Sequence, residues 1–90
     1  MYKISFSQKY EKIAKKFFKK HQNLKEKYAK TILLLQQNPY HPSLRLHKLQ
    51  GTLSKYHSIS IDMDYRIIID FIIVNDEIIL IDIGSHDEVY

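Results

Sequence analysis

The chain has 90 residues, of which 44% are hydrophobic and 12% aromatic, which suffices for one domain with a thin core but not for two. It has no cysteine, which excludes disulfides and thiolate chemistry, and no apolar run long enough to span a membrane. The N-terminal segment lacks the continuous apolar stretch of a signal peptide, so we expect a cytoplasmic protein.

The formal net charge of +4 hides an asymmetry between two halves of the chain. Residues 1–50 carry twelve Lys and Arg against two Asp and Glu, a net charge of +10, whereas residues 51–90 carry two against eight, a net charge of −6. So basic a half indicates either a polyanionic partner, such as RNA or DNA, or a solvated face that keeps the protein soluble. Charge alone does not separate these two interpretations.

An extended segment followed by a helix opens the chain. Tyr2, Ile4 and Phe6 alternate with polar residues, which predicts a short strand over residues 2–6. Ser7 then provides a hydroxyl of the kind that caps helix N-termini. Apolar side chains follow at helical spacing, with lysines on the opposite face, and predict a helix. They are Tyr10, Ile13, Ala14, Phe17 and Phe18, with His21 at the end.

A second helix is predicted after a short break at residues 21–23. Asn23 and Glu26 have the spacing of a capping box at a helix N-terminus. The apolar residues of this helix are Leu24, Tyr28, Ile32 and Leu35. Asn38-Pro39 ends it, because the residue before a proline disfavours the helical conformation. The short break favours an antiparallel hairpin of the two helices.

Beyond Pro42 the hydrophobic period changes from helical to two residues. Leu44 and Leu46, with Leu49 as a further member, suggest a strand. Residues 56–62 alternate between apolar and polar side chains and predict a half-buried strand. Its core side chains are Ile59 and Ile61, and its outward ones are Ser58, Ser60 and Asp62.

Two further strands, at 65–74 and 77–83, are rich in β-branched residues and are joined by a turn at Asn75-Asp76. If the inward side chains of the first are Tyr65, Ile67, Ile69 and Phe71, then Arg66 and Asp70 face outward. We therefore predict an α+β fold, a single domain over residues 1–90 with the order β-α-α-β-β-β. The helical hairpin packs on one face of a mainly antiparallel sheet, which leaves the other face free for a site.

Acid–base groups and one arginine gather in the strand region. They are His47, His57, Asp62, Asp64, Arg66 and His86. The sequence has no metal-ligand spacing, phosphate-binding loop or nucleophile motif, so we expect no cofactor and no metal. This combination suits phosphodiester cleavage in RNA, where the ribose 2′-OH is the nucleophile. Histidine transfers protons near neutral pH, and arginine matches the geometry of a phosphate.

Three short motifs mark the second half of the chain. They are His47-Lys48-Leu49-Gln50-Gly51 followed by Tyr56, then Asp64-Tyr65-Arg66-Ile67-Ile68-Ile69, and Ile83-Gly84-Ser85-His86-Asp87-Glu88-Val89-Tyr90. Together they resemble the RelE/ParE toxin superfamily, and most closely its YafQ-like, RelE-like branch of mRNA interferases. The resemblance covers the whole chain and implies a RelE-like fold in the toxin of a type II toxin–antitoxin system. It also implies cofactor-free cleavage of mRNA in the ribosomal A site, contacts with ribosomal RNA, and a cognate antitoxin.

The same resemblance implies roles for individual residues. His86 matches the catalytic histidine, as general acid, while His47 and Asp64 are alternative candidates for the base. Arg66 either holds the scissile phosphate or forms an ion pair with Asp64 or Asp82. The residues assigned to substrate binding are Tyr90, Tyr65, Lys48 and Lys55.

Other functions remain open at this point. The matching branch has a further histidine where this chain has Ser60, which raises the alternative of a catalytically weak relative that acts mainly through antitoxin binding. A ParE-like inhibitor of DNA gyrase is a second alternative on the same fold. His86 argues against the gyrase inhibitor, because those relatives need no histidine acid.

Overall fold

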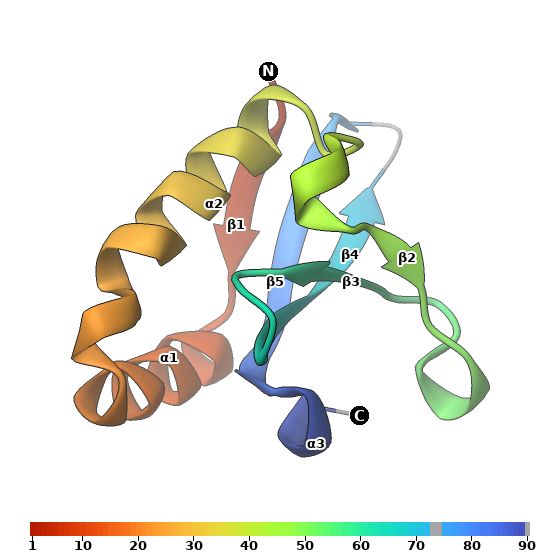
Figure 1. Cartoon of the computed structure of the whole chain (residues 1–90). Helices are drawn as coiled ribbons and strands as arrows, with labels where there is room; N and C mark the ends of the chain where they lie inside the picture. Colours follow the sequence, from red (N-terminus) through yellow and green to blue (C-terminus); the bar gives the residue numbers. More distant parts are fainter. Residues whose placement is uncertain (73–74, 90) are drawn as a thin grey trace.

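The computed structural model describes residues 1–72 and 75–89 (Figure 1). Its elements in chain order are β1 (Lys3–Phe6), α1 (Gln8–Lys20), η1 (Gln22–Leu24), α2 (Lys25–Gln37), η2 (Pro42–Leu44), β2 (His47–Lys48), η3 (Gly51–Leu53), β3 (His57–Ser60), β4 (Tyr65–Ile72), β5 (Glu77–Ser85) and α3 (His86–Val89), where η denotes a short 3₁₀ helix. Four strands follow the helical hairpin, one for each segment predicted as a strand, although the predicted order β-α-α-β-β-β counted only three, and α3 was not predicted. None of the helices in the described ranges is long and apolar enough to cross a membrane.

The strands form one five-stranded sheet in the order β1-β5-β4-β3-β2. β1 pairs in parallel with β5, and the other neighbours are antiparallel, which confirms the α+β class and the mainly antiparallel sheet. The first strand therefore lies at one edge, beside the last strand in sequence. A register shift in the β4–β5 pairing, between Ile68 and Ile69, marks a β-bulge.

The helix α1 begins as predicted, but α2 does not. The Ser7 hydroxyl accepts a hydrogen bond from the Tyr10 N–H at 3.2 Å and caps α1. The capping box predicted for α2 is wrong, because Asn23 lies within η1 and Leu24 occupies the N-cap position without a side-chain bond. Leu24 is 4% exposed and belongs to the main core. The helix ends at Gln37, directly before Asn38-Pro39, as predicted.

The helical hairpin covers one face of the sheet, and the main core lies between the two layers (Figure 1). The strand residues on this face include Ile59, Ile67 and Ile69, each fully buried, which confirms the predicted inward parity of β3 and β4. Within the helical layer the Tyr10 and Tyr28 hydroxyls form a hydrogen bond of 2.8 Å. Burial is the main reason that the pKa of Tyr10 is raised.

The other face of the sheet is not entirely free, contrary to the prediction. A second small core of Leu49, Ile68 and Val89 covers part of it, with residues of η3 and β5 packed around it. Ser58 and Ser60, predicted to face outward, are only 0% and 7% exposed.

The predicted strand over Leu44, Leu46 and Leu49 is limited to His47–Lys48. Leu44 belongs instead to η2, where it is 2% exposed and joins the main core. The buried leucine therefore holds a turn rather than a strand.

Candidate functional site

The start of β4 and the end of β5 bring three of the predicted site residues together. Arg66 is paired with Gly84 across the two strands, and Tyr65 with Ser85. One residue further out, the His86 N–H donates a hydrogen bond of 3.2 Å to the Asp64 carbonyl oxygen. Strand pairing thus places Asp64, Arg66 and His86 at the same end of the sheet.

Asp62 organises the turn between β3 and β4. Its Oδ1 atom accepts hydrogen bonds of 2.9 Å from the N–H groups of Asp64 and Tyr65. An aspartate that bonds the backbone two and three residues ahead fixes a tight turn. The sequence placed Asp62 among the acid–base groups but did not predict that it organises a turn. The sequence signal for this turn was the position of Asp62 two residues before Asp64.

Arg66 faces the side of the sheet opposite to the helices, as its strand parity predicted. The Arg66 Nη1 atom donates to the Asp62 carbonyl oxygen at 2.6 Å and contacts the Tyr65 carbonyl oxygen at 3.4 Å. Both contacts use Nη1, so they do not occupy the Nε–Nη2 edge of the guanidinium. Arginine binds phosphates best through such paired N–H groups.

His86 is the first residue of α3, and its side chain is 60% exposed. Its Nδ1 atom lies 3.6 Å from the Asp87 Oδ1 atom. The imidazole is therefore open to a ligand from solvent while its backbone is fixed by the bond to Asp64.

His47 lies on the same face of the sheet as Arg66 but two strands away. It is paired with Ser58 on β3, and Ser60, two residues further along that strand, is paired with Arg66. Directly opposed residues in antiparallel strands share a face, and standard spacings give roughly 12 Å between the Cα atoms of His47 and Arg66. A bound nucleotide could therefore bridge the two residues. The His47 Nδ1 atom lies 3.2 Å from the Arg45 carbonyl oxygen.

The residues assigned to substrate binding do not share one surface. The Tyr65 ring lies on the helical face, with its centroid 5.4 Å from that of Phe17 and 4.7 Å from that of His21. Lys48 is paired with His57, so it has the opposite parity to His47. The Lys55 Nζ atom lies 5.0 Å from the ring centroid of Tyr56, as a cation–π contact. Tyr90 lies outside the described residues.

A small basic cavity lies beside Tyr65 and was not predicted. Its volume is about 210 Å³, and its polar lining residues are Lys16, Lys20 and His21. The His21 ring packs against Phe17 at 4.5 Å as well as against Tyr65. The four-residue spacing of the two lysines on one helix face was the sequence signal for this cavity.

The surroundings of His57 indicate a structural role. Its ring packs edge-on against Phe71 at 5.1 Å, and its Nδ1 atom is buried with no hydrogen-bond partner in the described part of the chain. Burial, aided by the positive charge of Lys48, lowers the pKa of His57. Within residues 1–72 and 75–89, no three histidine or carboxylate side chains come together as a metal site.

Comparison with known proteins identifies relatives of this arrangement. A family model described as the bacterial toxin of type II toxin–antitoxin systems, YafQ, matches residues 2–90. The crystal structure of YafQ from Escherichia coli strain BL21(DE3) is 20% identical, with a TM-score of 0.81 over 100% of this chain and 99% of that chain. No match was found among proteins with curated descriptions.

Two further solved structures have the same fold. A metal-bound toxin from Helicobacter pylori is 26% identical, with a TM-score of 0.76 over 100% of both chains. A chain of the E. coli DinJ–YafQ toxin–antitoxin complex is 22% identical, with a TM-score of 0.76 over 99% of this chain and 97% of that chain. The five-stranded sheet and its helical layer are thus common to these toxins.

Proposed function

Because this chain belongs to the YafQ family of bacterial toxins of type II toxin–antitoxin systems, we propose that it is a ribosome-dependent mRNA endonuclease. The observation that supports the proposal is the hydrogen bond between His86 and Asp64, which brings a solvent-open imidazole to the same end of the sheet as Arg66. An imidazole and a guanidinium in this arrangement suit acid–base cleavage of a phosphodiester.

The proposed reaction uses the ribose 2′-OH of the mRNA as the nucleophile. A base removes the 2′-OH proton, the 2′-oxygen bonds to phosphorus, and the bond from phosphorus to the 5′-oxygen breaks. His86 gives a proton to the leaving 5′-oxygen, and Arg66 neutralises the charge that develops on the phosphate oxygens. The products are a 2′,3′-cyclic phosphate and a 5′-hydroxyl end. No metal or cofactor takes part in these steps.

His47 and Asp64 are both candidates for the base. The Asp64 carbonyl oxygen accepts a hydrogen bond from the His86 N–H. His47 lies on β2, so Ser60 on β3 separates it from Arg66 on β4. A nucleotide that spans the face between β2 and β4 would reach both. Comparison of His47→Gln with Asp64→Asn in a cleavage assay identifies the base as the residue whose loss slows cleavage more.

The proposed partners are a cognate antitoxin, mRNA in the ribosomal A site and ribosomal RNA, all in the cytoplasm. Toxin–antitoxin complexes of relatives, DinJ–YafQ and YoeB–YefM, support the antitoxin. For the RNA partners, the support is the basic N-terminal half of the chain, because phosphate contacts dominate nucleic-acid affinity.

The first test is a primer-extension map of mRNA after brief induction of the wild-type protein and of His86→Gln. Removal of a general acid typically slows a reaction by a factor of 10² to 10⁴, so we expect cuts within translated codons that disappear in the variant. His41→Gln is the matched control, because His41 is exposed at the N-cap of η2 and is not one of the proposed site residues.

The other outcomes contradict specific parts of the proposal. A folded His86→Gln protein that cuts mRNA like the wild type would exclude His86 as the acid. Growth arrest with intact mRNA would move the target to DNA gyrase or another enzyme. Normal growth with intact mRNA would indicate a protein that acts mainly by binding its antitoxin.

A further inference from the structure

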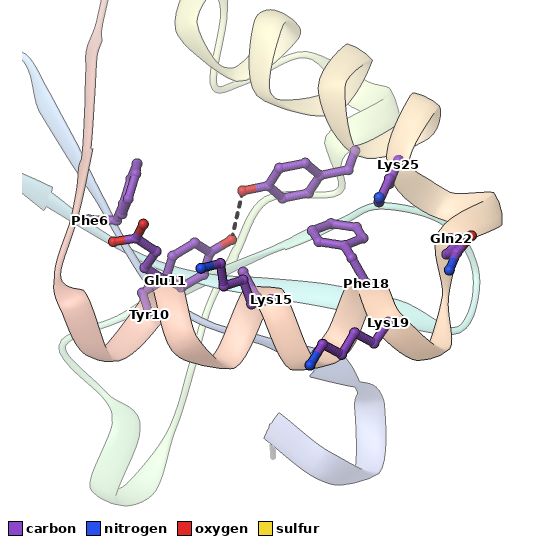
Figure 2. A pocket seen from close by; sticks show the side chains of 10 residues that line it. Phe6, Tyr10, Glu11, Lys15, Phe18, Lys19, Gln22 and Lys25 are labelled. Carbon is purple, nitrogen blue, oxygen red and sulfur yellow. Dashed lines mark hydrogen bonds between the residues drawn. The ribbon is translucent and has the colours of Figure 1, made fainter.

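An open groove runs between α1 and α2 on the helical layer (Figure 2). Its volume is about 580 Å³, and its apolar lining residues include the aromatic Phe6, Tyr10, Phe18 and Tyr28. Three lysines, Lys15, Lys19 and Lys25, stand around it. None of these residues belongs to the proposed catalytic site.

The wall of the groove is held in a fixed shape. The Tyr10 and Tyr28 hydroxyls bond to each other at 2.8 Å, marked by the dashed line in Figure 2. The Phe18 and Tyr28 rings pack edge-on with centroids 4.8 Å apart. A preformed wall lowers the entropic cost of binding another chain.

Phe6 is one of the large apolar residues that the fold leaves exposed. It stands at one end of the groove, its side chain is 54% exposed, and its ring lies 5.9 Å from that of Tyr10. An exposed aromatic residue that continues an apolar groove is typical of a protein-binding surface. A partner that covered Phe6 would bury it against Tyr10.

The charges around the groove favour an acidic partner. Lys15 and Lys19 extend from α1 and Lys25 from the start of α2, all exposed to solvent, against the single acid Glu11 (Figure 2). The apolar wall favours a protein over a nucleic acid, because Tyr10 is 2% exposed and the Phe18 and Tyr28 rings stand at 68° to each other. Such a wall offers no stack of parallel rings for successive bases.

We propose that this groove binds the apolar side chains of an acidic segment of a protein partner. The identity of that partner as the antitoxin rests on the proposed function. Arg66 lies on the opposite face of the sheet, so a segment in the groove does not cover it. The groove then holds the partner without itself blocking the site.

The test is a calorimetric titration of purified cognate antitoxin into the purified full chain and its variants. Phe6→Ser removes an apolar side chain from the groove, and we expect the Kd to rise about tenfold. Leu33→Ser is the matched control, because Leu33 is also 54% exposed, lies on α2 and does not line the groove. The control Kd should stay within about twofold of the wild-type value.

Charge reversal gives a second, independent pair of variants. Lys15→Glu with Lys25→Glu changes one groove lysine on each helix, and we expect a Kd at least about tenfold higher. Lys12→Glu with Lys27→Glu changes the net charge equally on the same two helices, at exposed positions outside the groove. This control should raise the Kd by less than about threefold.

Circular dichroism confirms that each variant is folded before it is compared. Groove variants that bind the antitoxin like their controls would overturn the proposal, as would a wild-type chain that does not bind it. Unchanged antitoxin affinity with weakened ribosome binding would make the groove a nucleic-acid surface, which also overturns it. Cleavage of mRNA is measured separately, so an inactive wild-type protein would refute the endonuclease and leave the groove result readable.

Discussion

Arg66 is positioned before any substrate arrives. Its two contacts to the Asp62 and Tyr65 carbonyl oxygens tie one end of the guanidinium to the β3–β4 turn. A side chain held in this way loses less conformational entropy when it binds a phosphate. The planar shape of the guanidinium is therefore as important for the proposed reaction as its charge.

We expect Arg66→Lys to fail although it keeps the positive charge. An ammonium group cannot bond the carbonyl oxygens and a phosphate in the same plane, so the single-turnover cleavage rate on programmed ribosomes should fall at least about tenfold. The melting temperature should change by no more than a few degrees, because Arg66 lies outside both cores. Cleavage by Arg66→Lys at the wild-type rate would show that Arg66 contributes only its positive charge.

His57 makes stability depend on pH. Its pKa is lowered in the folded state because burial disfavours the charged form, with Lys48 adding repulsion. The unfolded chain, with a histidine pKa of about 6.5, binds the proton more readily than the folded one. The free energy of unfolding is therefore largest above about pH 6.5 and falls as the pH drops below that value.

His57→Phe should raise the free energy of unfolding and reduce its decrease at acidic pH. Phenylalanine keeps the packing against Phe71 and removes the buried Nδ1 atom, whose missing hydrogen bond costs roughly 1–3 kcal/mol. The measurement is urea denaturation of both proteins at pH 7.5 and pH 5.5. An equal loss of stability on acidification in the two proteins would show that His57 is not the group responsible.

The β3–β4 turn depends on one side-chain oxygen of Asp62. Asp62→Ala removes both bonds to the turn backbone and should cost about 1–2 kcal/mol of stability. It should also slow cleavage, because the turn positions Asp64 and the carbonyl oxygen that holds Arg66. Asp62→Asn keeps the Oδ1 acceptor and should therefore retain most of the stability and most of the cleavage rate. Urea denaturation measures the first and single-turnover cleavage the second. If Asn were as damaging as Ala, the carboxylate charge and not the turn would be the cause.

The sequence predicts those elements whose signals are local. Ser7 caps α1 and Asn38-Pro39 ends α2, because capping and proline sterics act within one turn. The start of α2 was missed because the burial of Leu24, a long-range effect, outweighs the local spacing of Asn23 and Glu26. The bulge at Ile68 and the helix α3 also depend on contacts between distant segments.

The candidate site could be predicted only in part, for the same reason. The parity of β4 put Arg66 on the correct face, because strand side chains alternate. Periodicity cannot tell that Ser60 is buried, that the Tyr65 ring contacts His21, or that Asp62 bonds the turn. These features depend on which side chains meet in three dimensions.

The protein as a whole has a basic helical layer and an acidic sheet. The half with the net charge of +10 contains both long helices, and the half with the net charge of −6 contains β3, β4 and β5. In the proposed function, ribosomal RNA is attracted to this basic helical side, which leaves the opposite face of the sheet, with Arg66, for the mRNA. If the protein binds ribosomal RNA as proposed, the charge distribution favours an orientation with α1 against the phosphate backbone.

Ribosome binding should therefore weaken steeply with salt, and the lysines of the small cavity should contribute. Lys16→Gln with Lys20→Gln should reduce the slope of log K against log salt by roughly one per lysine. The measurement is sedimentation with ribosomes over a range of potassium chloride concentrations. Lys9→Gln with Lys12→Gln, towards the other end of α1, is the control with the same loss of charge. Equal slopes for the two variants would show a diffuse basic surface without a specific contact.

The parallel pairing of β1 with β5 affects how the protein is made. Residues 3–6 are synthesised more than seventy residues before their partners at 77–80. Contacts between such distant segments form slowly, because a long loop must close before they contribute. β1 therefore stays unpaired until the start of β5 has been synthesised. A nascent chain of this toxin consequently lacks its folded site until β5 and His86 have left the ribosome.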